Sequence, residues 1–160
     1  MKQMPYKSKK SNQGFSMIEV LVSILIMTFG LLGISGLMLK GVDNATSSDL
    51  SARANQSANE IMDAMRANAN NRSSYLTNMD TKGSDISGTT IADTDRKQWL
   101  ETLALLPGGK GSIETDVAIT NGFTVTIRFN NCIGTLTKTE IDACASSTSN
   151  LRDLVFKFSV

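Results

Sequence analysis

The sequence predicts an α+β protein in which one long N-terminal helix packs on a small antiparallel β-sheet of three or four strands. Two changes of pattern along the 160 residues support this architecture. Apolar residues first form a continuous run and then recur at steps of three and four up to about Ala69, as in a helix. From Ser112 onwards the period changes to two, and Val, Ile, Thr and Phe become frequent, as in β-strands.

The first half of the long helix is apolar on every side. Residues 20–39 carry no charge, and extending the run back to Phe15 adds only Glu19. A helix needs about 20 apolar residues to cross a bilayer. A buried helix in a soluble core is the alternative, but a chain of this size can hardly surround so long an apolar helix. We therefore expect residues 15–39 to span a membrane.

Basic residues on one side of the run predict its orientation. Four lysines precede it, at positions 2, 7, 9 and 10, whereas only Lys40 stands at its far end before a segment of mixed charge. The positive-inside rule then keeps the N-terminus in the cytoplasm and exports the rest of the chain. A cleaved secretory signal has a shorter apolar region and an A-x-A-like site, which is missing here, so a retained anchor is favoured.

The second half of the helix, residues 40–69, is amphipathic. One stripe consists of apolar residues at steps of three and four: Leu50, Ala54, Ala58, Ile61, Met65 and Ala69. Charged and amide side chains lie between them, so we expect the stripe to pack on a head rather than to bind a ligand. The glycines at 30, 33, 36 and 41 suit either close packing between helices or local unwinding, and the sequence alone leaves both open.

The part of the chain after the helix begins with a polar stretch. Residues 68–95 are rich in Asn, Ser, Thr, Asp and Gly and are expected to form a loop, in which Tyr75, Leu76, Ile86 and Ile91 are candidates to anchor short elements. A short helix capped by Asp93 or Asp95 is expected to follow and to end at the Pro107-Gly-Gly turn. Within it, Trp99 is interpreted as a packing anchor rather than a platform for a ligand.

The last third of the chain predicts the sheet. The expected strands are Ser112–Thr120, Phe123–Asn130 and Leu154–Val160. Asn121 and Gly122 are expected to form a two-residue turn that joins the first two strands into a hairpin. Strand alternation places Phe156 and Phe158 in the core and Lys157 on the outer face.

Composition excludes several classes of function. The chain has 16 Lys and Arg, 15 Asp and Glu, no His and two Cys. Without histidine there is no His-based triad and no His-ligated metal, and two cysteines cannot build a four-cysteine metal site. The near-zero net charge disfavours direct binding of nucleic acid. A membrane-tethered enzyme is a weak alternative, because the head has no G-x-S-x-G or S-x-x-K motif, so we expect no enzyme activity, cofactor or metal.

The junction between the basic leader and the apolar run carries a specific motif. The sequence KKSNQG at 9–14 is followed by FSMIE at 15–19. This resembles the cleavage site of type IV prepilins, in which a basic leader ends in Gly and the mature chain has Glu at its fifth position. The resemblance implies the pilin fold, cleavage by a prepilin peptidase between Gly14 and Phe15, and methylation of the new Phe15 amine. It also implies that Glu19 pairs with a subunit's N-terminal amine during filament assembly.

Electrostatics supports these implied roles. An amine and a carboxylate each lose solvation in a low-dielectric medium, and only their pairing offsets that cost, so the pair can set the register between subunits. Gly14 lets a protease approach the backbone closely because it has no Cβ. On this interpretation residues 1–14 are a removed leader, 15–39 the membrane or filament-core segment, 40–69 the amphipathic half of the helix, and 70–160 a periplasmic head.

The two cysteines, Cys132 and Cys144, lie on the side of the membrane that is expected to be exported. Disulfides persist in the oxidising periplasm, so a bond between them is expected, with two free thiols as the alternative. Many pilins carry a C-terminal disulfide loop of this kind. A redox-active pair is disfavoured because the spacing is not C-x-x-C.

The leading functional hypothesis is a minor pilin of a type IV pilus, incorporated into the filament or priming its assembly. The Trp99 helix, the Leu-Pro-Gly-Gly turn at 106–109 and the following Gly-Ser-Ile resemble minor pilins of the PilV type, the pilus modification proteins. Such pili serve twitching motility, adhesion and DNA uptake. The implied partners are the prepilin peptidase, other minor pilins, the major pilin, the inner membrane and the pilus assembly platform. The implied location is the inner membrane, as a single-pass protein, and then the filament.

Two other interpretations remain at this point. A minor pseudopilin of a type II secretion system has the same leader, anchor and small head, and differs in its partners. A plain single-pass receptor stub would keep the anchor but would not be processed at Gly14.

Overall fold

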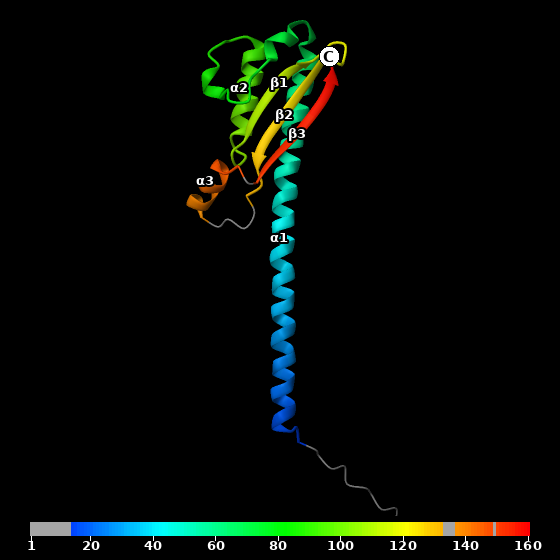
Figure 1. Cartoon of the computed structure of the whole chain (residues 1–160), viewed down its shortest axis with the longest axis vertical. Helices are drawn as coiled ribbons and strands as arrows, with labels where there is room; N and C mark the ends of the chain where they lie inside the picture. Colours follow the sequence, from blue (N-terminus) through cyan, green and yellow to red (C-terminus); the bar gives the residue numbers. More distant parts are fainter. Residues whose placement is uncertain (1–13, 133–136, 149) are drawn as a thin grey trace, which may run out of the picture. The chain divides into compact units, whose positions relative to one another are not determined.

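The computed structural model describes residues 14–132, 137–148 and 150–160. Apart from Gly14, the predicted leader lies outside the described residues. The chain divides into two compact units, Met1–Gly41 and Val42–Val160, and each is described by itself. The elements are α1 (Met17–Ala67), η1 (Ala69–Tyr75), η2 (Gly83–Asp85), α2 (Ile91–Leu103), β1 (Lys110–Asp116), β2 (Gly122–Asn130), α3 (Lys138–Ser146) and β3 (Leu151–Ser159) (Figure 1).

Within the second unit, α1 contributes the predicted stripe to the core. Its buried residues are Ala54, Ser57, Ala58, Ile61, Met62 and Met65. Each buried Ile or Met side chain stabilises the fold by about 1.5–3 kcal/mol. The small Ala54 and Ala58, both at 0% exposure, allow close approach of the neighbouring elements. The stripe is therefore confirmed, although α1 ends at Ala67, so Ala69 begins η1 instead.

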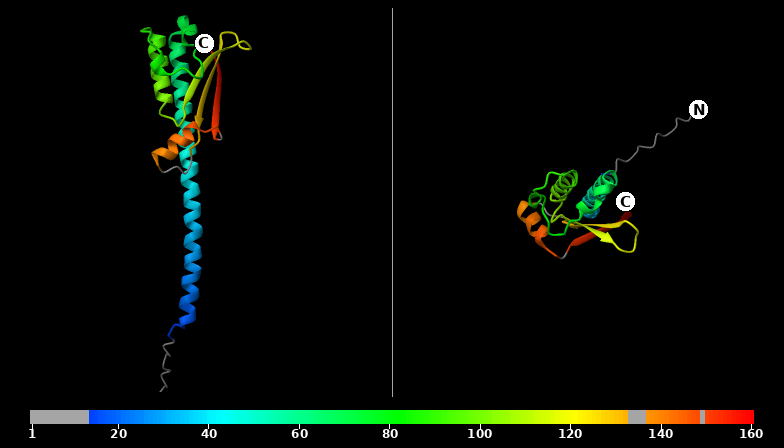
Figure 2. Two further views of the ribbon diagram at one scale, coloured as in Figure 1. Left: turned by 60° about the vertical axis from the view of Figure 1, so that its left-hand side comes forward. Right: turned by 90° about the horizontal axis from the view of Figure 1, so that it is seen from above.

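The sheet is three-stranded and antiparallel, in the order β1-β2-β3. The central strand β2 supplies four buried hydrophobic side chains, Phe123, Val125, Ile127 and Phe129. Figure 2 shows the sheet across α2 and the C-terminal part of α1, so that one face of the sheet is covered by helices. On β3, Phe158 is buried, Phe156 packs against the core and Lys157 is exposed, as strand alternation predicted. The α+β architecture matches the pilin fold.

Helix α2 is anchored by Trp99, which is 4% exposed and belongs to the core. The ring lies on the backbone of Gly111 in β1: a Cβ at Gly111 would come within 2.4 Å of Trp99 Cη2. The packing role expected of Trp99 is confirmed. The N-cap of α2 is Thr90, and the Asp93 side chain bonds back to it in a capping box. The prediction that Asp93 or Asp95 forms the cap is therefore wrong. Asp93 stands at the third helical position, where its carboxylate bonds to the cap residue.

The connection between β1 and β2 differs from the prediction. β1 ends at Asp116 and β2 begins at Gly122, so a two-residue turn at Asn121-Gly122 is wrong and the loop has five residues, 117–121. Asp116 starts the loop as an Asx turn, its Oδ1 accepting from Ala118 N at 2.9 Å. Asn121 closes it with a positive φ of 54°. The Asx turn therefore ends β1 four residues before the predicted end at Thr120.

Three further helical segments shape the head. η1 ends at Tyr75 and η2 is followed by Ile86, two of the residues named as anchors of short elements in the predicted loop, whereas no element was predicted where α3 lies. β3 begins three residues earlier than expected, at Leu151. No residue of α3 is buried, so hydrophobic contacts hold it weakly. Two links attach it to the sheet, the disulfide from Cys132 to Cys144 and the side chain of Asn130.

Asn130, at the end of β2, is 1% exposed and clamps the C-terminal end of α3. Its Nδ2 lies within hydrogen-bond distance of the carbonyl oxygens of Cys144 (2.7 Å), Ala145 (2.8 Å) and Ser147 (2.9 Å), which share its two N–H groups. These carbonyls are among those that a helix leaves unsatisfied at its end. One buried amide thus replaces water at the last turn of α3.

We expect Asn130→Asp to release α3 while the sheet stays folded, because a carboxylate would face the carbonyl oxygens without a donor. The lost hydrogen bonds are worth about 1–3 kcal/mol, so amide hydrogen exchange in α3 should accelerate roughly 5- to 100-fold. The same change at the exposed Asn78 is the control. Equal exchange of α3 in both variants would show that Asn130 does not hold it.

Candidate assembly site

The proposed cleavage and assembly residues lie at the start of α1. Gly14 and Phe15 precede the helix and are exposed, and Phe15 is 85% exposed. A Cβ at Gly14 would meet nothing within 4 Å. The described structure therefore gives no packing reason for glycine at this position. Glycine at this position instead suits recognition of the backbone by another protein.

Glu19 lies in the first turn of α1. The positive end of the helix dipole favours a carboxylate at this place. Its backbone carbonyl accepts a hydrogen bond from Ser23 Oγ at 2.7 Å, one turn further on. The side chain is exposed, and it is the only charged group between Gly14 and Leu39. Glu19 thus presents one charge on an otherwise apolar surface.

The apolar residues around Glu19 are uncovered in the described structure. Near the N-terminus, α1 contains an 18-residue segment with a mean hydropathy of 2.4, and no residue of this segment is buried. Large side chains along this segment are 48–88% exposed, among them Met17, Val20, Phe29 and Leu37. Apolar surface on this scale requires a lipid bilayer or neighbouring protein. The segment is therefore consistent with membrane anchoring.

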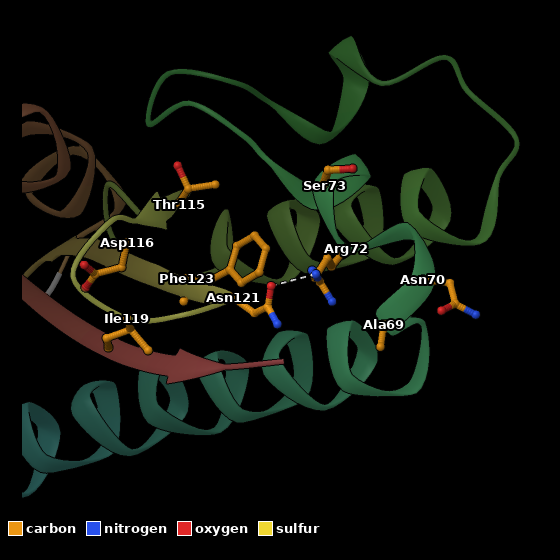
Figure 3. A pocket seen from close by; sticks show the side chains of 10 residues that line it. Ala69, Asn70, Arg72, Ser73, Thr115, Asp116, Ile119, Asn121 and Phe123 are labelled. Carbon is orange, nitrogen blue, oxygen red and sulfur yellow. Dashed lines mark hydrogen bonds between the residues drawn. The ribbon is translucent and has the colours of Figure 1, made fainter.

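The head contains a cavity of about 550 Å³ between η1 and the β1–β2 loop (Figure 3). Arg72 Nη2 donates to Asn121 Oδ1 at 2.8 Å across it. Asp116, also in the lining, accepts from Lys157 Nζ at 2.8 Å, and this ion pair lowers the pKa of the Asp116 carboxyl. The three polar side chains Arg72, Asn121 and Asp116 are thus each engaged within the head. Within the described parts of the chain, no three His, Cys, Asp or Glu side chains are grouped to hold a metal.

Tyr75, a candidate anchor in the predicted loop, is a buried titratable group with a partner, Asp95, that the sequence did not predict. It is 0% exposed, and its hydroxyl donates to Asp95 Oδ2 at 2.6 Å. The hydroxyl also accepts from Asn68 Nδ2 at 3.4 Å. Burial raises the pKa of the Tyr75 phenol above its ordinary value of 10.0, and the bond to Asp95 raises it further. These contacts tie η1 to α1 and α2.

We expect the free energy of unfolding to fall as the pH rises above about 10. The phenol of the unfolded chain ionises there, whereas the buried phenol of the folded chain stays protonated. The contribution of Tyr75 is therefore complete below pH 10 and is lost as the pH rises through the raised pKa. Tyr75→Phe should cost about 1–2 kcal/mol at neutral pH and flatten the alkaline fall, measured by denaturant unfolding at pH 7 to 11. An equal alkaline fall in both proteins would contradict the assignment.

Cys132 and Cys144 form a disulfide in the structure, with their Cα atoms 5.8 Å apart. Cys132 follows β2, and Cys144 lies in the last turn of α3. Cross-linking a loop of this length stabilises a fold by about 3 kcal/mol in the chain-entropy model. The disulfide and the Asn130 clamp fasten the same end of α3.

A comparison with protein families finds one motif. The model described as the prokaryotic N-terminal methylation motif matches residues 9–35, which include Gly14, Phe15 and Glu19. Comparisons with curated proteins and with solved structures find no match. The motif and the fold together support a prepilin-like protein with a pilin or pseudopilin role. Proteins of this kind are structural subunits and generally not enzymes.

Proposed function

We propose that this protein is a minor pilin of a type IV pilus, of the PilV type, that enters the filament or primes its assembly. One observation carries the proposal. A prepilin cleavage motif leads into an exposed apolar segment of α1, residues 15–39, whose single carboxylate is Glu19, and the chain continues into a small head with its own core. A chain of this build is inserted in a membrane first and exchanges lipid for neighbouring subunits later.

Processing at Gly14 creates the charge that Glu19 needs. Cleavage by a prepilin peptidase frees the amine of Phe15, which is positive at neutral pH and stays so after methylation. In the filament core this amine and a Glu19 carboxylate are both removed from water, and each is stabilised only by an opposite charge. A subunit that enters out of register leaves both unpaired. The pair thereby selects the correct axial position.

The head supports the narrower assignment to the PilV type. The sequence features behind that resemblance form one structural unit, in which Trp99 packs on Gly111 and the turn at Gly108 and Gly109 reverses the chain between them. Gly108 has a φ of +62°, and a Cβ there would lie 2.5 Å from the carbonyl of Ala145. Trp99 is in the core and is 4% exposed, so this unit acts as a scaffold and binds partners through its outer surface.

The partners follow from this role. The prepilin peptidase acts on Gly14 and Phe15, the inner membrane holds residues 15–39 before assembly, and the assembly platform moves the subunit into a filament. Other minor pilins and the major pilin surround α1 there. The N-terminus faces the cytoplasm and the head faces the periplasm until the subunit leaves the membrane.

Mass spectrometry of the mature N-terminus tests the central claim. We expect a chain that begins with N-methylated Phe15. An intact Met1, or a cut beyond Leu39, would overturn the proposal.

Deletion of the gene separates the two systems that use such subunits. A minor pilin predicts loss of surface pili with normal protein secretion. Loss of secretion with normal pili would instead assign the protein to a type II secretion system as a minor pseudopilin.

A further inference from the structure

Strand β3 has an open edge. The sheet order places β3 at one side, and among the described residues only β2 pairs with it. Its pairing with β2 is continuous from Leu151 to Ser159, without a bulge or a proline. The opposite edge, β1, is partly covered by a bridge between Thr77 and Ile113. An uncovered edge of nine residues offers backbone groups to another strand.

The outer face of β3 carries a symmetric pattern. Asp153, Val155 and Lys157 lie on the face opposite the core, and Val155 is 56% exposed. Val155 stands midway between an acid and a base, two residues from each. Two antiparallel copies of β3 centred on Val155 would therefore place each Asp153 opposite a Lys157 and Val155 opposite itself.

The other registers that keep the same face outward lack this match. Centring the pair on Asp153 sets two aspartates opposite each other, and centring it on Lys157 sets two lysines opposite each other. Like charges directly opposite on a sheet destabilise the pairing. Sliding one strand by two residues places Asp153 opposite Val155 or Ser159 and so loses the ion pairs. The charges of β3 thus select one register of self-pairing.

The charged side chains are already held on this face. Arg128 binds Asp153 through two hydrogen bonds of 2.7 and 2.8 Å. Lys157 donates to Asp116 at 2.8 Å. Holding these side chains in place lowers the entropy that a new contact would remove.

We propose that the open edge of β3 pairs with β3 of a second copy of this chain, antiparallel and centred on Val155. Across the junction, Asp116, Lys157, the second copy's Asp153 and its Arg128 form a row of alternating charge. The junction joins two three-stranded sheets into one of six strands. Because the strands run in opposite directions, one head is reversed relative to the other. Pairing through β3 therefore excludes side-by-side packing of these two heads with the same polarity.

Cysteine cross-linking of the full-length protein in detergent micelles tests the register. Val155→Cys should give a covalent dimer with a short bis-maleimide, since directly opposite side chains are about 5 Å apart. The control is Ser159→Cys on the same face, whose two copies would be about 27 Å apart along the strands. Equal cross-linking of the two variants would overturn the proposal.

Charge variants, made in the Val155→Cys protein, test whether the ion pairs between Asp153 and Lys157 stabilise the dimer. Asp153→Asn with Lys157→Gln removes both ion pairs across the junction, and we expect the dimerisation constant to fall roughly 2- to 30-fold. The matched control, Asp80→Asn with Lys110→Gln, removes an exposed ion pair of 2.7 Å near the other edge of the sheet. An equal effect of the two double variants would contradict pairing through β3.

A variant that places two like charges opposite each other tests the register without changing the ion pairs of Asp153 with Lys157. Val155→Lys places two ammonium groups opposite each other and should abolish the dimer that unspecific amine cross-linking captures in the native protein. Thr126→Lys adds the same charge to the same face of the neighbouring strand β2, where Thr126 pairs with Val155 of its own chain, and should retain the dimer. Retention in both variants, or loss in both, would refute self-pairing at Val155.

Discussion

A chain with Glu19→Val is expected to be processed at Gly14 and inserted in the membrane, but to be nearly absent from filaments. The substitution makes the anchor more apolar, so insertion is unaffected. It also removes the proposed partner of the Phe15 amine, and on that proposal the amine stays unpaired when the subunit leaves the membrane. Breaking a desolvated ion pair by removing one member is strongly unfavourable. We expect incorporation to fall at least about tenfold, measured as the ratio of subunit in sheared filaments to subunit in membranes.

Ser23→Val is the matched control for this result. Ser23 lies one turn beyond Glu19 on α1 and bonds only to the backbone carbonyl of Glu19. Its replacement adds the same apolar side chain but leaves the carboxylate in place. Glu19→Asp keeps the charge on a shorter side chain and should recover part of the incorporation. Equal incorporation of the two valine variants would show that the charge of Glu19 has no role in assembly.

Phe129→Ala is expected to have the largest effect on the stability of the head. Phe129 is 0% exposed at the centre of the sheet, and removing its ring leaves a cavity. Such substitutions cost about 3–5 kcal/mol, a large part of the 5–15 kcal/mol that a domain typically has. Trp99, the only tryptophan, lies in the same core, so its fluorescence reports the denaturant midpoint.

The comparison for Phe129 is Phe156→Ala. Phe156 is only half-buried on the edge strand β3, so the same change removes less buried surface and should cost less. Phe15→Ala, in the anchor, should leave the head's midpoint unchanged because every core residue lies between Ala54 and Phe158. A midpoint that shifts equally for Phe129 and Phe156 would contradict the central position of β2.

Local patterns predicted the parts of the fold that depend on burial. The stripe from Ala54 to Met65 and the alternation of β2 are visible in the sequence because each buried residue repeats at the period of its own element. Trp99 was recognised as a core residue because few other environments suit an indole. These predictions required no knowledge of which segments meet in space.

The missed features depend on contacts with no periodic signal. α3 buries no residue, so it lacks the apolar pattern of a packed helix. Its clamp joins Asn130 to carbonyls 14 to 17 residues away, and nothing near Asn130 indicates them. Tyr75 and Asp95 meet across 20 residues in the same way. A Thr-x-x-Asp capping pattern at Thr90 was present in the sequence and would have located the start of α2.

The hairpin shows how one local signal can override another. Asn121-Gly122 predicts a two-residue turn, yet Asp116 forms its own turn with Ala118 and ends β1 early. The candidate assembly residues, by contrast, can all be proposed from the sequence, because Gly14, Phe15 and Glu19 lie within one short segment. Their roles stay predictions.

The position of β3 as the last of the three strands has a consequence for the timing of export. In the proposed orientation the head crosses the membrane from Val42 towards Val160, so β1 and β2 emerge before the strand that completes the sheet. Phe158, on β3, is the last buried residue of the core along the chain. Both cysteines are across before β3 begins, so oxidation can precede closure of the sheet. The head therefore reaches its final fold only after β3 has crossed the membrane. A subunit stalled before that point has an unpaired β2 edge that other chains can bind.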